Sequence, residues 1–106
     1  VMVLDQHRFN RIIGGNPFPE AAANGKVVHA FVLAHPAKNA DHARLDALAA
    51  STERWQLTTD AFYLHAPDGI GRSKLAARAE SILGVPATAR NWRTMVEIER
   101  LAREVS

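Results

Sequence analysis

The feature that most constrains the fold is the segment 26–35, KVVHAFVLAH. In an extended chain successive side chains point to opposite faces, so Val28 and Val32 share one face with the alanines. Phe31 and Leu33 share the other face with two histidines. A strand that is apolar on both faces is typical of the interior of a sheet that is covered on both sides. We therefore expect a central strand here.

The rest of the chain reads as further helices and strands. Helices are expected at residues 5–14, 40–51, 74–83 and 89–104, a weak helical turn at 21–25, and strands at 1–4, 55–59 and 61–66. Asp60 tolerates a left-handed backbone in the turn of the expected hairpin, and Ser73 and Thr88 can cap the last two helices. The last helix is expected to turn four apolar side chains inward: Trp92, Met95, Val96 and Leu101.

This order of elements predicts one α+β domain. A hairpin mixed with helices favours an antiparallel or mixed four-stranded sheet with helices mainly on one face. The 106 residues are enough for one conventional core. The chain has no cysteine, which excludes disulfides, thiolate metal sites and thiol nucleophiles and is typical of a reducing compartment. The apolar stretch 27–34 is too short to span a membrane, so we expect a cytoplasmic protein.

Positive charge is concentrated in one part of the sequence. Residues 69–93 contain five basic side chains and a single acidic one, a net charge of +4, whereas residues 1–68 have a net charge of −1. Such a segment attracts anions if the fold gathers its side chains. The alternative is that these are separate arginines on a solvated surface.

The best candidate site is the turn at residues 67–75, PDGIGRSKL, which leads from a strand into a helix. A helix N-terminus presents unpaired N–H groups that favour an anion. The start of the last expected helix repeats the pattern. The candidate ligand-binding residues are Gly69, Gly71, Arg72, Ser73, Lys74, Arg90 and Asn91. If the last two helices form an antiparallel pair, their N-termini lie about 15 Å apart, which suits two phosphates better than one small anion.

Other chemistry has weaker support. The turn lacks the spacing of a nucleotide-binding Walker loop. His65 and Asp68 flank it and could act as acid and base, although Asp68 could equally bond turn N–H groups. Trp92 could stack on a base, but its apolar stripe favours a core position. His29 and His35 lie about 20 Å apart on an extended strand, so no metal or other cofactor is expected.

Three motifs carry a family resemblance. At 16–20 (NPFPE), 67–75 and 84–94 (GVPATARNWRT) the chain resembles the bacterial family known as domain of unknown function 1697. The motifs occur in family order and the resemblance covers essentially the whole chain, but the family brings no known activity or catalytic residue. Its members usually begin with another α+β half. The resemblance therefore implies the C-terminal half of a two-part protein, whose partners include its N-terminal half and, through an exposed surface, further copies of itself.

The leading functional hypothesis is a noncatalytic module that binds a phosphate-bearing ligand or nucleic acid through the glycine turn and the basic helix N-termini. One alternative is an enzyme that acts on a phosphorylated small molecule. Another is a structural or assembly domain in which the arginines lie on an assembly surface. The sequence does not decide whether there is any catalysis.

Overall fold

A four-stranded antiparallel sheet forms the centre of the computed structural model, which describes residues 6–18 and 27–104. The strands are β1 (Val28–Leu33), β2 (Arg54–Leu57), β3 (Ala61–His65) and β4 (Ala87–Asn91), in the order β2-β3-β1-β4. The expected α+β class is confirmed. The strand expected at 1–4 and the helical turn expected at 21–25 lie outside the described residues.

β1 is the interior strand that the sequence predicts. It pairs with β3 on one side and β4 on the other, and all six of its residues are buried. Val28 and Val32 pack into one hydrophobic cluster, whereas Phe31 and Leu33 pack into a second. The two clusters lie on opposite faces of the sheet, since these residues alternate along the strand.

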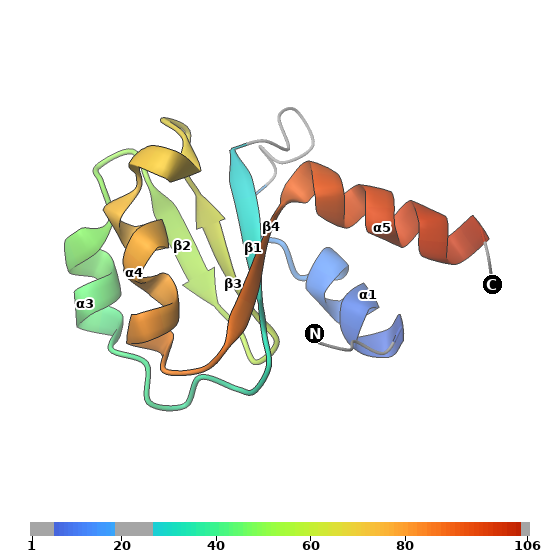
Figure 1. Cartoon of the computed structure of the whole chain (residues 1–106), viewed down its shortest axis with the longest axis horizontal. Coiled ribbons are helices and arrows are strands. Elements are labelled where there is room, and N and C mark those ends of the chain that lie inside the picture. Colours follow the sequence, from blue (N-terminus) through green and yellow to red (C-terminus); the bar gives the residue numbers. More distant parts are fainter. Residues whose placement is uncertain (1–5, 19–26, 105–106) are drawn as a thin grey trace.

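The helices are divided between the two faces (Figure 1). The pair α3 (His42–Leu48) and α4 (Lys74–Leu83) covers one face, and the pair α1 (Gln6–Gly14) and α5 (Trp92–Glu104) covers the other. The expectation of helices mainly on one face is wrong. Both faces of β1 are apolar and each needs its own covering layer, and β4 carries the chain from one layer to the other.

The strand β4 is the main element that sequence reasoning missed. Residues 89–91 were expected to begin a helix capped by Thr88, but they belong to β4 and α5 begins at Trp92. Pairing with β1 outweighs local helix propensity, because the ladder satisfies backbone groups that an isolated helix start leaves free. Two side chains expected to point inward, Val96 and Leu101, are 43% and 49% exposed, because only the first turns of α5 lie over the sheet.

The β2–β3 hairpin is confirmed, but its turn is not left-handed. Among the described residues, positive φ angles occur only at glycines, so the conformation considered for Asp60 is absent. The turn closes instead through Thr58, whose N–H donates to the Ala61 carbonyl at 2.8 Å and whose hydroxyl accepts the Ala61 N–H at 3.2 Å. Side-chain bonding thus replaces backbone strain at this turn.

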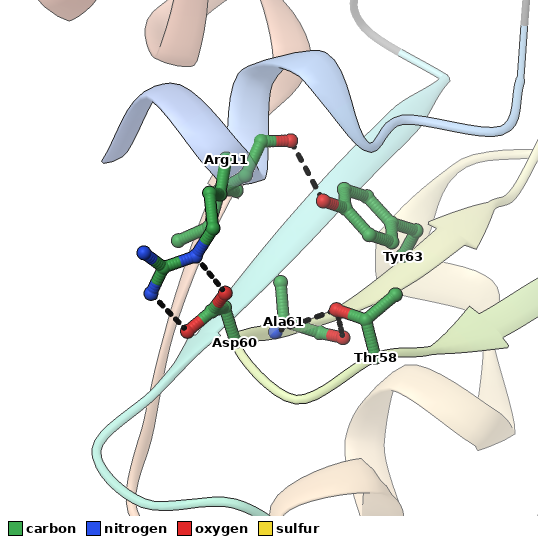
Figure 2. Close-up of polar contacts among 6 residues, drawn as sticks. Arg11, Thr58, Asp60, Ala61 and Tyr63 are labelled. Atoms are coloured by element: carbon green, nitrogen blue, oxygen red, sulfur yellow. Dashed lines mark hydrogen bonds and ion pairs between the residues drawn. The ribbon is translucent and has the colours of Figure 1, made fainter. Parts of the chain in front are cut away.

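Helix α1 is attached to this hairpin by two polar contacts (Figure 2). The Arg11 guanidinium forms an ion pair with Asp60, with Nε 3.1 Å from Oδ2. The buried Tyr63 hydroxyl donates to the Ile12 carbonyl at 2.7 Å. Burial, and then the nearby Asp60 carboxylate, raise the pKa of Tyr63 to about 12, so its hydroxyl stays a donor at neutral pH.

We expect Tyr63→Phe to lower the free energy of unfolding by about 1–3 kcal/mol, because it leaves the Ile12 carbonyl without its buried donor. Chemical denaturation would measure the loss, and faster amide exchange in α1 would locate it. Asp60→Asn is the matched control: it removes an ion pair whose arginine is 62% exposed and should cost no more than about 1 kcal/mol. Equal losses in the two variants would contradict the role assigned to the hydroxyl.

Candidate anion-binding site

The turn between β3 and α4 is built from a glycine and a short 3-10 helix. Gly69 adopts a φ of 100°, a conformation that L side chains rarely adopt, and its N–H donates to the Ala66 carbonyl at 3.0 Å. The 3-10 helix follows over Ile70–Arg72. Within this turn the N–H groups of Arg72 and Ser73 are already bonded to the carbonyls of Gly69 and Ile70. Three N–H groups of the turn are therefore bonded internally, whereas those of Ile70 and Gly71 have no acceptor among the described residues.

Further free donors lie in the first turn of α4. Ser73 caps the helix as expected: its hydroxyl accepts the Ala76 N–H at 3.0 Å, and its carbonyl accepts the Ala77 N–H at 3.2 Å. Among the described residues, the N–H groups of Lys74 and Leu75 have no acceptor. Two unpaired donors at the positive end of a ten-residue helix favour an anion.

A surface pocket of about 390 Å³ lies at this helix start. It joins the turn to the end of α3 and the loop that follows, and it is lined by Ala47, Leu48, Ala50, Glu53, Arg72, Ser73 and Lys74. Glu53 is held in place because its Oε1 accepts the Ala50 N–H at 2.9 Å. Its carboxylate opposes an anion, so the formal charge of the lining side chains is +1.

Only three of the seven predicted site residues line this pocket: Arg72, Ser73 and Lys74. The two glycines shape the turn beside it. The residues from α3 and the following loop were missed, because nothing in their local sequence indicates a contact with a turn some twenty residues further along the chain. This contact is made by tertiary packing of α3 against α4.

Arg90 and Asn91 lie elsewhere. Arg90 is exposed on β4, where its guanidinium donates to the Ala89 carbonyl at 2.9 Å. Asn91 has the structural role considered for it, since its Oδ1 accepts the Thr94 N–H at 2.8 Å at the start of α5. Asn91 also lines a separate pocket of about 480 Å³ with Arg93, Thr94, Glu97 and Ile98.

The basic segment is thus split between the two faces of the sheet. The two helices expected as an antiparallel pair, α4 and α5, lie on opposite faces with β4 between them. The estimate of about 15 Å between their N-termini therefore does not apply. The charge of +4 is spread over separate surfaces rather than gathered into one groove.

The candidate acid and base do not meet at the pocket. His65 is buried on the α1/α5 face, where its ring lies 5.8 Å from that of Phe18. Asp68 accepts the Thr52 hydroxyl at 2.8 Å, a bond that helps to hold the turn. Trp92 is buried against Tyr63 in the core, as its apolar stripe predicts. The described parts of the chain contain no cluster of three or more potential metal ligands.

A family model matches the first part of the chain. Residues 1–63 match the family described as "Protein of unknown function (DUF1697)", which is more than half of the chain. The chain belongs to the DUF1697 family. The matched part of this DUF1697 chain contains the motif at 16–20 and ends in β3. The turn and the pocket lined by Asn91 lie beyond the matched part. The pocket at the start of α4 is lined by residues from both sides of this boundary. No curated protein and no solved structure matches the chain.

In residues 6–18 and 27–104 every helix is too short or too polar to pass through a lipid bilayer. The interpretation of the chain as the C-terminal half of a longer protein stays a prediction.

The burial of His29 predicts that the folded state loses stability in acid. Burial lowers its pKa below the usual 6.5, and its Nδ1 atom is buried without a hydrogen-bond partner among the described residues. The unfolded chain binds a proton near pH 6.5 and the folded chain only at lower pH. The free energy of unfolding should therefore be highest above about pH 6.5 and decrease as the pH falls towards the folded-state pKa.

Urea denaturation at about pH 7.5 and about pH 5 would measure this decrease. His29→Leu should flatten the dependence, whereas His35→Gln changes an exposed histidine and should leave it intact. An unchanged pH dependence in the His29 variant would contradict this assignment.

Proposed function

We propose that this chain is a noncatalytic module that binds a phosphate-bearing ligand in the pocket between α3 and the start of α4. One observation carries the proposal: Arg72 and Lys74 line the same pocket at which α4 begins with two free N–H groups. Phosphate oxygens suit this set of donors, because they accept hydrogen bonds from backbone N–H groups and from arginine and lysine together.

The site favours a small phosphate-bearing molecule over a long nucleic acid. A nucleic-acid backbone needs several cations along one surface, whereas this pocket is lined by two, and Arg90 and Arg93 lie apart from it on β4 and α5. The Glu53 carboxylate also disfavours dense negative charge. Catalysis of phosphate chemistry has no specific support, because the candidate base His65 lies on the opposite face of the sheet.

The test compares two variants with the same loss of charge. Arg72→Ala with Lys74→Ala removes both cations from the pocket, and Arg90→Ala with Arg93→Ala removes two cations away from it. Calorimetric titration at low salt with mononucleotides, inorganic phosphate and a short oligonucleotide should show binding of a small phosphate compound. We expect the first variant to weaken it at least about tenfold, or ~1.4 kcal/mol, and the second to change it little.

Equal weakening by the two double variants would indicate attraction by net charge and refute a site at the pocket. Failure of the unaltered chain to bind any of these ligands at low salt would refute the proposed function altogether. A stronger response to the oligonucleotide than to mononucleotides would favour a nucleic-acid partner instead.

A further inference from the structure

The two edges of the sheet are not equivalent. In an antiparallel ladder, alternate residues direct their backbone groups to the neighbouring strand and away from it. Immediately before β4, the Pro86 carbonyl faces β1, since it accepts the Ala34 N–H at 2.9 Å. Ala87 and Ala89 therefore direct their backbone groups outward, away from the sheet.

Side chains of the protein itself occupy this outer edge of β4. The Glu80 carboxylate accepts the Ala87 N–H at 2.9 Å. The Arg90 guanidinium donates to the Ala89 carbonyl at 2.9 Å. Covering an edge with charged side chains is a common way in which proteins prevent another strand from pairing there. The β4 edge is closed in this sense.

The β2 edge is open. The Thr58 N–H donates to Ala61 in β3, so Arg54 and Gln56 also face β3 and the backbone groups of Trp55 and Leu57 point outward. Within the described ranges 6–18 and 27–104, these outward N–H and C=O groups have no hydrogen-bond partner. The strand thus presents two residues with unpaired donors and acceptors, a template for a further strand.

We infer that β2 pairs antiparallel with β2 of a second copy of this chain, with a two-fold axis at Gln56. This register places Trp55 opposite Leu57 of the second copy, and Leu57 opposite its Trp55, so the outward groups can form four backbone hydrogen bonds. Trp55 and Leu57 lie on the same face and are partly buried apolar side chains. Cross-strand pairs of an aromatic and an aliphatic residue stabilise such a ladder.

The same register is free of charge conflict. Gln56 lies opposite itself on the axis, and Arg54 lies opposite Thr58, so no like charges face each other. A two-fold interface requires that one surface complement itself, and the short β2 segment does so over every pair from Arg54 to Thr58. The inference does not depend on the phosphate pocket, because no residue from Arg54 to Thr58 lines that pocket.

Disulfide trapping provides a direct test. Gln56 and its counterpart would form a non-hydrogen-bonded pair with Cα atoms about 4.5 Å apart, which is within the range that a disulfide spans. The chain has no cysteine, so Gln56→Cys introduces a single thiol. Mild oxidation should convert this variant into a covalent dimer. Ala89→Cys, exposed on the closed β4 edge, is the matched control and should remain monomeric under the same conditions.

Sedimentation equilibrium of the unaltered chain tests the same interface without a cross-link. We expect a monomer–dimer equilibrium, which Gln56→Lys should weaken at least about tenfold by placing two like charges on the axis. Circular dichroism would verify that this exposed substitution leaves the fold intact. A chain that is monomeric at all concentrations, an association that Gln56→Lys does not weaken, or equal cross-linking of the two cysteine variants would overturn the inference. A monomeric chain that binds a strand of another protein would overturn it too.

Discussion

Phe62→Ala is expected to lower the free energy of unfolding by about 3–5 kcal/mol. Phe62 is fully buried on the α3/α4 face, where its ring centroid lies 5.5 Å from that of Phe31 and 5.8 Å from that of Trp55. The substitution removes both contacts and leaves a cavity between the sheet and the layer formed by α3 and α4. Small domains have a total stability of about 5–15 kcal/mol, so the variant should unfold near ambient temperature or in little denaturant.

Urea denaturation of the purified variant would measure the loss. Phe62→Leu is the control, because it keeps most of the volume and should cost much less than the alanine variant. A loss of less than about 1 kcal/mol in Phe62→Ala would show that this face of the sheet contributes little to stability.

Trp92→Ala is expected to have an effect of similar size, about 3–5 kcal/mol. Trp92 is only 7% exposed, and its ring centroid lies 6.4 Å from that of Tyr63 in the α1/α5 cluster. It is also the first residue of α5, so its loss removes the anchor of that helix on the sheet. Thermal unfolding followed by circular dichroism would measure the change.

Val96, in the same helix, provides the control substitution. Val96→Ala alters the same helix one turn later, but Val96 is 43% exposed and should change stability by no more than about 1 kcal/mol. If Trp92→Ala instead left stability unchanged and weakened oligonucleotide binding, the tryptophan would be a stacking platform and its assignment to the core would be wrong.

Both predictions follow from a part of the fold that sequence reasoning identified. The alternation in residues 26–35 predicted an interior strand with two apolar faces, and the two clusters on β1 confirm it. Helix α4 was also predicted over residues 74–83 with its Ser73 cap, and the structure has the same bounds and the same cap. These features depend on side-chain periodicity and on capping chemistry within a few residues, which a sequence displays directly.

The candidate site was predicted only in part. Arg72, Ser73 and Lys74 share a pocket, and free N–H groups lie at the start of the helix as well as in the glycine turn, where three of the donors are bonded internally. Glu53 lines the pocket as well, but nothing in its neighbouring sequence predicts this. Arg90 and Asn91 lie away from the pocket, because they belong to β4 rather than to the first turn of the last helix.

By itself, therefore, the sequence determined the interior strand, the hairpin, the Ser73 cap and the α+β class, because these follow from interactions between residues close along the chain. Only the tertiary structure decided that the helices divide between two faces and that residues 87–91 form an edge strand. It also decided that Glu80 and Arg90 close one edge of the sheet while Trp55 and Leu57 leave the other open. The physical reason is that strand pairing and face selection depend on which distant partners are present, and a strand such as β4, with little apolar periodicity, is stabilised mainly by the neighbour it joins.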